Sequence, residues 1–292
     1  AHKGLAAYRL PTATEKVVRP HALGSFQEMV RASARSPAML AYLDNIRNSQ
    51  YGPNENYARE LLELHTLGVH GGYTQRDVRE VARCLTGWTV ERRFLRSYDG
   101  LAFQERHHDD GEKLVLGRRI APGGGKQDLY QVLDIVLNHP ATAKHIAGKL
   151  GRHFLGTDQG SAVGRAERRY LEHGGQIVPM LEALLEPGAL MDSPPLLKRP
   201  FDYTVSALRA VAAETDGGDG MQNHLEAMGQ PLFEWPMPDG FPDRTDSWTG
   251  SLLARWNFAS ALATDAIPGT RAPWSELQKR TQGSIGQMIL GE

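Results

Sequence analysis

Two glutamates in the run 53–68 have a spacing that suits acid–base or metal chemistry. Glu60 and Glu63 are three residues apart, so on a helix they lie on the same face. Asn56 and Arg59 fall within the same arc, about 100° wide. We expect Glu60 and Glu63 to act as a base or as metal ligands, Arg59 to stabilise negative charge, and Asn56 to bind a ligand. The same pattern is typical of a solvated helix face, so both interpretations stay open.

A second segment, residues 106–113, is rich in groups that bind metals or transfer protons. Its sequence is Arg-His-His-Asp-Asp-Gly-Glu-Lys. We expect His108 and Asp109 to complete a site with the two glutamates of the first segment, with a divalent metal as the cofactor. Lys113 is a candidate ligand-binding residue. The alternative is a hydrated turn, which the Asp-Gly step favours.

Arginines that follow the first segment have the chemistry to bind an anionic group. Arg76, Arg79 and Arg83 share one face of a predicted helix. Arg83 is a candidate catalytic residue, because a guanidinium can stabilise the negative charge of a transition state. Salt bridges to nearby glutamates are the alternative use. Trp235, in a loop rich in proline, is a candidate to line a ligand cleft.

The composition narrows the class of protein. The 292 residues carry 33 Lys and Arg against 34 Asp and Glu, a net charge of −1, which excludes a general attraction to nucleic acid. No apolar run approaches the roughly 20 residues of a membrane span. The single cysteine, Cys84, excludes an internal disulfide and a cysteine-rich metal site. The sequence leaves the oligomeric state open.

Helices must position these residues, because the dominant period of the sequence is helical. Capping residues, stop residues and apolar spacings predict helices over about 25–34, 38–46, 54–67, 74–85, 127–138, 141–155, 161–173, 176–186, 200–214, 220–228, 249–264 and 274–290.

Residues around 92–117 break the helical pattern. Apolar and aromatic residues flank Asp99-Gly100, a pair typical of a two-residue hairpin turn. The predicted fold class is therefore mainly α, with one multi-helix domain over residues 1–292 and a small β-hairpin insertion around 92–117.

Taken in order, these segments resemble a known bacterial family, the one catalogued as domain of unknown function eighteen hundred. The resemblance covers nearly the whole chain and rests on NENYARELLEL at 54–64, TLG at 66–68, Tyr73-Thr74, ARCLTGW at 82–88, HDDGEK at 108–113, residues 139–143, GQP at 229–231, PDGFP at 238–242 and LARWN at 253–257. His65 departs from it, because family members commonly have phenylalanine there. The resemblance implies that the chain corresponds to the C-terminal portion of longer members, in which case we expect a site shared with their N-terminal part to be incomplete.

The resemblance implies an exported bacterial protein, periplasmic or secreted, although the first residues carry no apolar segment typical of a secretion signal. It also implies a protein partner similar to alkaline phosphatases and sulfatases, encoded by a neighbouring gene. It supplies no reaction. Two hypotheses follow: a metal-assisted or acid–base hydrolase of an extracytoplasmic polymer, or a non-catalytic binding or assembly protein. Convergence of the candidate residues in a pocket would favour the first, and their mutual saturation by hydrogen bonds the second.

Overall fold

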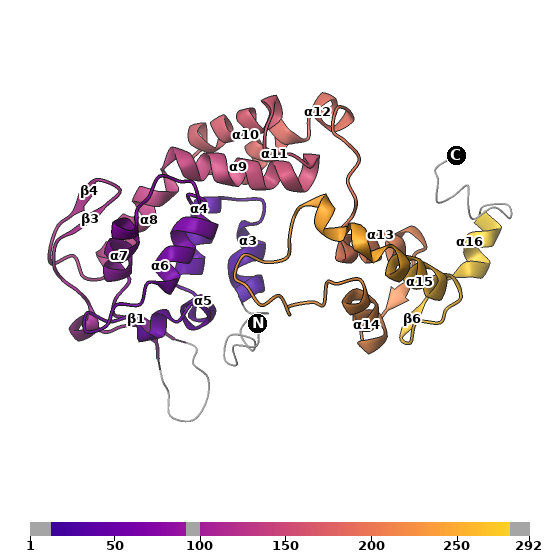
Figure 1. Cartoon of the computed structure of the whole chain (residues 1–292), viewed down its shortest axis with the longest axis horizontal. Coiled ribbons are helices and arrows are strands. Elements are labelled where there is room, and N and C mark those ends of the chain that lie inside the picture. The colour runs from indigo at the N-terminus through magenta and orange to yellow at the C-terminus, as the bar shows by residue number, and fades with distance from the viewer. Residues whose placement is uncertain (1–12, 92–99, 281–292) are drawn as a thin grey trace. The chain divides into compact units, whose positions relative to one another are not determined.

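Helices account for most of the described residues, which confirms the predicted mainly α fold (Figure 1). The computed structural model describes residues 13–91 and 100–280. The chain divides into two compact units, residues 2–194 and residues 195–292. Within the described ranges, no helix combines the length and the apolar character that crossing a membrane requires.

Two of the predicted helices begin at a capping side chain. α4 (Phe26–Ala34) follows Ser25, whose hydroxyl accepts a hydrogen bond from a backbone N–H of the first turn. α7 (Gln75–Cys84) follows Thr74 and has a complete capping box, in which Thr74 and Asp77 each accept the other's backbone N–H. These bonds satisfy N–H groups that have no partner inside a helix, so the two predicted helix starts are confirmed.

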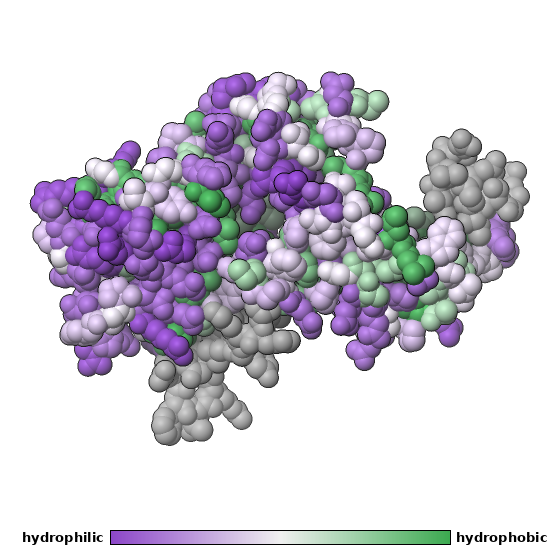
Figure 2. All heavy atoms as spheres, viewed as in Figure 1, coloured by the Kyte–Doolittle hydropathy of each residue, from purple (hydrophilic) through white to green (hydrophobic). Residues whose placement is uncertain are grey.

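The other elements of residues 2–194 follow in chain order. The helices are α3 (Arg19–His21), α5 (Pro37–Tyr42), α6 (Asn56–Glu60), α8 (Gln127–Leu137), α9 (Pro140–Leu155), α10 (Ser161–Glu172), α11 (Ile177–Leu184) and α12 (Pro187–Met191), with π-helical turns at Thr14–Val18 and Leu61–His65 and 3₁₀ turns at Asn45–Arg47 and Glu105–His107. One apolar core lies among α4 to α8, and a second lies among α9, α10 and α11. Polar side chains cover most of the face of this unit that Figure 2 shows.

Two small hairpins form the β insertion. β1 (Trp88–Val90) pairs antiparallel with β2 (Leu101–Phe103), and β3 (Lys113–Val115) pairs antiparallel with β4 (Arg118–Ile120). Asp99 of the predicted turn lies outside the described residues. The second hairpin turns at Leu116-Gly117, where both residues have a positive φ (49° and 74°), as a type I′ turn requires.

A backbone bridge joins the beginning of α4 to the beginning of α11. The N–H of Phe26 donates to the carbonyl of Gly175 at 2.9 Å, and the N–H of Ile177 donates to the carbonyl of Gly24 at 2.8 Å. Gly175 has a positive φ of 75°, and a Cβ atom there would lie 2.9 Å from a side-chain carbon of Gln27. Glycine therefore permits the close approach of the two segments.

Residues 195–292 form a separate small helical unit with its own core. Its elements are α13 (Pro200–Ala210), β5 (Glu214–Thr215), α14 (Asp219–Ala227), a 3₁₀ segment (Thr245–Ser251), α15 (Leu252–Ala263), β6 (Thr270–Arg271) and α16 (Trp274–Arg280). β5 pairs antiparallel with β6. The core contains Met221, Leu225, Phe258 and Leu262. The part of the predicted last helix beyond residue 280 lies outside the described residues.

Candidate functional site

The segment with the glutamate pair is a short α-helix that continues as a π-helical turn. α6 ends at Glu60, and Glu63 lies within the π turn Leu61–His65. π turns are rare and are frequent at functional sites. Asn56 anchors the start of α6, where its amide donates to the carbonyl of Leu43 at 3.1 Å.

The candidate residues on α6 face Tyr73 and the start of α7. Arg59 donates to the amide oxygen of Gln75 at 2.8 Å and to Glu55 at 3.3 Å. The Tyr73 hydroxyl donates to Glu63 at 3.4 Å. Partial burial and the adjacent Glu63 carboxylate raise the pKa of Tyr73. Glu60, like Glu63, is half-buried, so these groups are not merely a solvated helix face.

Two neutral histidines lie where the π turn ends. Burial, reinforced by the positive charge of Lys149, lowers the pKa of His65 to about 4. The Nε2 atom of His145 lies 3.3 Å from the carbonyl oxygen of Leu64, and burial lowers the pKa of His145 as well. Both imidazoles therefore favour the uncharged form near neutral pH.

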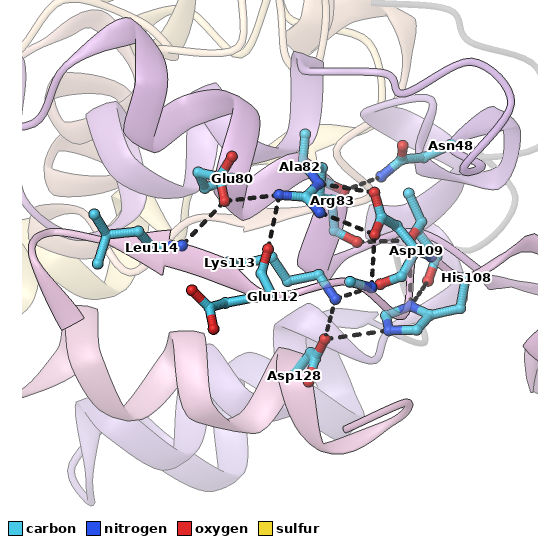
Figure 3. A network of polar contacts seen from close by, with 12 residues as sticks. Asn48, Glu80, Ala82, Arg83, His108, Asp109, Glu112, Lys113, Leu114 and Asp128 are labelled. Atoms are coloured by element: carbon cyan, nitrogen blue, oxygen red, sulfur yellow. Dashed lines mark hydrogen bonds and ion pairs between the residues drawn. The ribbon is translucent and has the colours of Figure 1, made fainter. Parts of the chain in front are cut away.

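Arg83 lies at the centre of a polar network, which Figure 3 shows between α7, β3 and α8. Its Nε and Nη2 atoms donate to the two carboxylate oxygens of Asp109 at 2.7 and 3.0 Å. Its Nη1 atom donates to Glu80 at 2.9 Å and to the carbonyl of Glu112 at 3.1 Å. The bond from Arg83 lowers the pKa of Asp109, and the same bond raises the pKa of Arg83. Arg83 therefore forms salt bridges with Glu80 and Asp109.

A buried charged triad lies beside Arg83 and consists of Lys113, Asp128 and His108 (Figure 3). The Nζ atom of Lys113 is 2.5 Å from Oδ2 of Asp128 and also donates to the carbonyl of Asp109. The Nε2 atom of His108 is 3.2 Å from the same Oδ2, and its Nδ1 atom is 2.9 Å from the carbonyl oxygen of Thr86. The side chains of Lys113 and Asp128 are fully buried. Both nitrogen atoms of His108 therefore already have oxygen partners.

Sequence reasoning missed Asp128. It occupies the first turn of α8, a position where an acidic residue normally interacts with the helix dipole and the solvent. Its neighbours in the triad, His108 and Lys113, are 20 and 15 residues away in sequence. The one signal in the sequence is the series of apolar residues that follow Asp128 in α8, which indicates that this helix packs in the core.

The predicted residues do not assemble into one metal site. Among the residues that the structure describes, no group of three or more His, Cys, Asp and Glu side chains is placed to hold a metal ion. His108 and Asp109 take part in the Arg83 network, whereas Glu63 contacts Tyr73. In residues 195–292, Trp235 is half-buried, and its indole N–H donates to Asp239 at 2.8 Å.

Gly124 packs directly against the triad. A Cβ atom at this position would overlap with Oδ1 of Asp128. We expect Gly124→Ala to lower the free energy of unfolding by about 1–3 kcal/mol, because the buried carboxylate would have to move. Urea unfolding followed by circular dichroism measures the loss. At Gly188 an added Cβ meets no atom within 4 Å, so Gly188→Ala is the matched control, and an equal effect of both changes would contradict the expectation.

Comparison with known proteins identifies a family but no activity. The family model described as "Protein of unknown function (DUF1800)" matches residues 1–290, nearly the whole chain. Neither a curated protein nor a solved structure matches the chain.

Proposed function

Since the chain belongs to the DUF1800 family, whose description names no reaction, we propose from its geometry that it is a non-catalytic binding or assembly protein. The observation that supports this proposal is that Arg83 and His108 are already engaged by partners within the chain. All three nitrogen atoms of the Arg83 guanidinium have acceptors within the chain, and both ring nitrogens of His108 contact oxygen atoms. Arg83 and His108 therefore act as links within the chain, and binding a metal or a substrate through their nitrogen atoms would require some of these bonds to break.

The network instead fastens elements together. Arg83 belongs to α7, Lys113 to β3 and Asp128 to α8. Glu80 adds a further link, because its carboxylate accepts the backbone N–H of Leu114 at 3.0 Å. Buried charges are tolerated only when they are paired and hydrogen-bonded, and here the pairing holds the second hairpin against two helices.

The surface that we propose for binding lies on α15, in residues 195–292. Three large apolar side chains of this helix are exposed, namely Leu252, Leu253 and Trp256, the last of them 75% exposed. Phe258 and Leu262 of the same helix are buried in the core. A helix normally buries its apolar side chains against the core and exposes its polar ones, so these three exposed apolar side chains depart from that pattern. Exposed large apolar side chains that lie close together are typical of protein-binding surfaces.

The proposed partner is a protein similar to alkaline phosphatases or sulfatases, and the proposed location is outside the cytoplasm. Both parts of the proposal rest on the family resemblance. An apolar surface on α15 is compatible with a stable complex, because the anchors of such interfaces are large aromatic and aliphatic side chains.

A binding measurement tests the proposal. The chain is mixed with the phosphatase- or sulfatase-like protein encoded beside its gene, and the dissociation constant is measured by isothermal titration calorimetry. We expect a complex that Trp256→Ser weakens by about 30-fold or more, the effect of losing an aromatic anchor. Met191→Ser is the control, because Met191 is 85% exposed but lies on α12. Absence of a complex, or equal affinities for all three proteins, would overturn the proposal.

A hydrolase is the second candidate function, and one observation favours it. The half-buried Glu63 lies on a π turn and accepts a hydrogen bond from Tyr73, so a carboxylate and a phenol adjoin each other at a rare backbone feature. Hydrolysis of a polysaccharide by the isolated chain, abolished by Glu63→Gln in a folded protein, would refute the non-catalytic proposal and support this one.

A further inference from the structure

A pocket lies beside the buried triad, and its lining residues include none of α15 and none of the segment that holds Glu63. Its volume is about 400 Å³, and it is lined by Phe103, Glu105, His108, Asp110 and the glycine-rich residues 123–127 that lead into α8. Pockets for small ligands have volumes of roughly 300–1,000 Å³. The size of this pocket is therefore sufficient for a small molecule.

The lining presents hydrogen-bond acceptors and donors side by side. Glu105 and Asp110 contribute exposed carboxylates, and Lys126 and Gln127 contribute exposed donors. Lys126 lies over the ring of Phe103, with its ammonium 5.7 Å from the ring centre. Both ring nitrogens of His108 already contact oxygen atoms of the chain.

This mixture argues against a charged ligand. A phosphate or carboxylate would face two carboxylates against a single ammonium, and like charges at short range repel. A metal ion is disfavoured by geometry, since the described residues contain no suitable group of three or more acidic, histidine or cysteine ligands. A hydroxyl group fits both kinds of neighbour, because it donates to a carboxylate and accepts from an ammonium or amide.

A buried acceptor lies directly behind the pocket wall. Among the described residues, Oδ1 of Asp128 has no hydrogen-bond partner, although this side chain is fully buried. The nearest part of the wall is Gly124, where a Cβ atom would overlap with that oxygen. The backbone of Gly124 packs against this oxygen, so the carboxylate of Asp128 supports the pocket wall from behind and does not itself line the pocket.

We propose that this pocket binds a neutral, hydroxyl-rich ligand, namely a sugar unit, either free or within a polymer. The lining offers hydrogen-bond acceptors, hydrogen-bond donors and one aromatic ring. Its glycines have no side chains, so the hydroxyl groups of a sugar can approach the backbone closely. The proposal concerns a site separate from α15 and does not depend on the protein–protein interaction proposed above.

Titrations monitored by NMR test this proposal on the full ¹⁵N-labelled chain. The probes are glucose, galactose, mannose and N-acetylglucosamine, together with a soluble oligomer of each. We expect at least one sugar to produce saturable shifts of the amide signals of residues 105–110 and 123–127. Tighter binding of the oligomer than of its monomer would assign the ligand to a polymer, and equal binding would assign it to free sugar. Phosphate and magnesium ions serve as charged probes and are expected to leave these signals unchanged.

Matched variants decide whether the pocket carries the binding. The double variant Glu105→Gln, Asp110→Asn is expected to weaken binding at least tenfold, because both carboxylate acceptors are lost. The control is the double variant Glu182→Gln, Asp192→Asn, which makes the same chemical changes at two exposed positions, one in α11 and one directly after α12. It is expected to leave the affinity for the sugar unchanged. Gln127→Ala provides a third variant with an expected loss. No shifts with any sugar, saturable shifts with phosphate or magnesium, or equal affinity in all variants would overturn the proposal.

Discussion

Lys113→Met is expected to lower the free energy of unfolding by about 3–5 kcal/mol, the range for a buried ion pair that loses one partner. Lys113 and Asp128 are fully buried and lie 2.5 Å apart at their charged atoms. Without the ammonium, His108 is the hydrogen-bond partner that the buried carboxylate of Asp128 keeps among the described residues. Urea unfolding followed by tryptophan fluorescence and circular dichroism measures the loss.

Two further variants show whether the charge, rather than the shape, causes this effect. Lys113→Met combined with Asp128→Leu is expected to recover most of the lost stability, because apolar side chains often replace a buried ion pair without loss. Arg119→Met breaks an exposed pair, in which Arg119 and Glu112 are 68% and 54% exposed, and is expected to change the stability by less than about 1 kcal/mol. A Lys113→Met effect as small as that of Arg119→Met would show that the triad is not needed for folding.

Acidification from about pH 6.5 to pH 4 is expected to destabilise the protein through His65. Its pKa falls from 6.5 to about 4 in the folded chain because the imidazole is buried. Between these values the unfolded chain binds a proton that the folded chain does not, so the stability falls as the pH falls. Each pKa unit corresponds to about 1.4 kcal/mol, which gives a loss of about 3 kcal/mol by pH 4. His145 contributes in the same direction, because its pKa is also lowered.

His65→Phe is expected to flatten this part of the pH dependence, since phenylalanine fills the site without a titrating group. The measurement is the free energy of unfolding in urea at several pH values between 7 and 4. His173→Phe is the control, because His173 is exposed and its replacement is expected to leave the slope unchanged. Equal slopes for the wild type and His65→Phe would contradict the assignment.

The helices could be predicted because their signals are local. Thr74 and Asp77 form the capping box within four residues of chain, and Gly156 ends α9 with a positive φ of 70°. The π turn at Leu61–His65 could not be predicted in this way. The same residues satisfy the pattern of an ordinary α-helix, and tertiary packing selects the wider turn.

Two of the candidate residues lie together in the structure. Arg83 and Asp109 were chosen separately from two segments, and the structure joins them by two hydrogen bonds. The roles assigned to Glu60 and Glu63 remain predictions. Asp128 could not be found from the sequence, because a buried carboxylate at the start of a helix is recognisable only from the partners that the fold brings to it.

The bridge between the starts of α4 and α11 has a consequence for the order of folding. The Arg83 network joins elements from α7 to α8, which are close in sequence, whereas the bonds from Phe26 and Ile177 join residues near opposite ends of the unit. Contacts between distant residues require more loop closure and therefore form more slowly. We therefore expect the bridge to close late, after α4 has packed in the core that it shares with α5 to α8, and a ribosome must release the chain beyond Ile177 before the bridge can form.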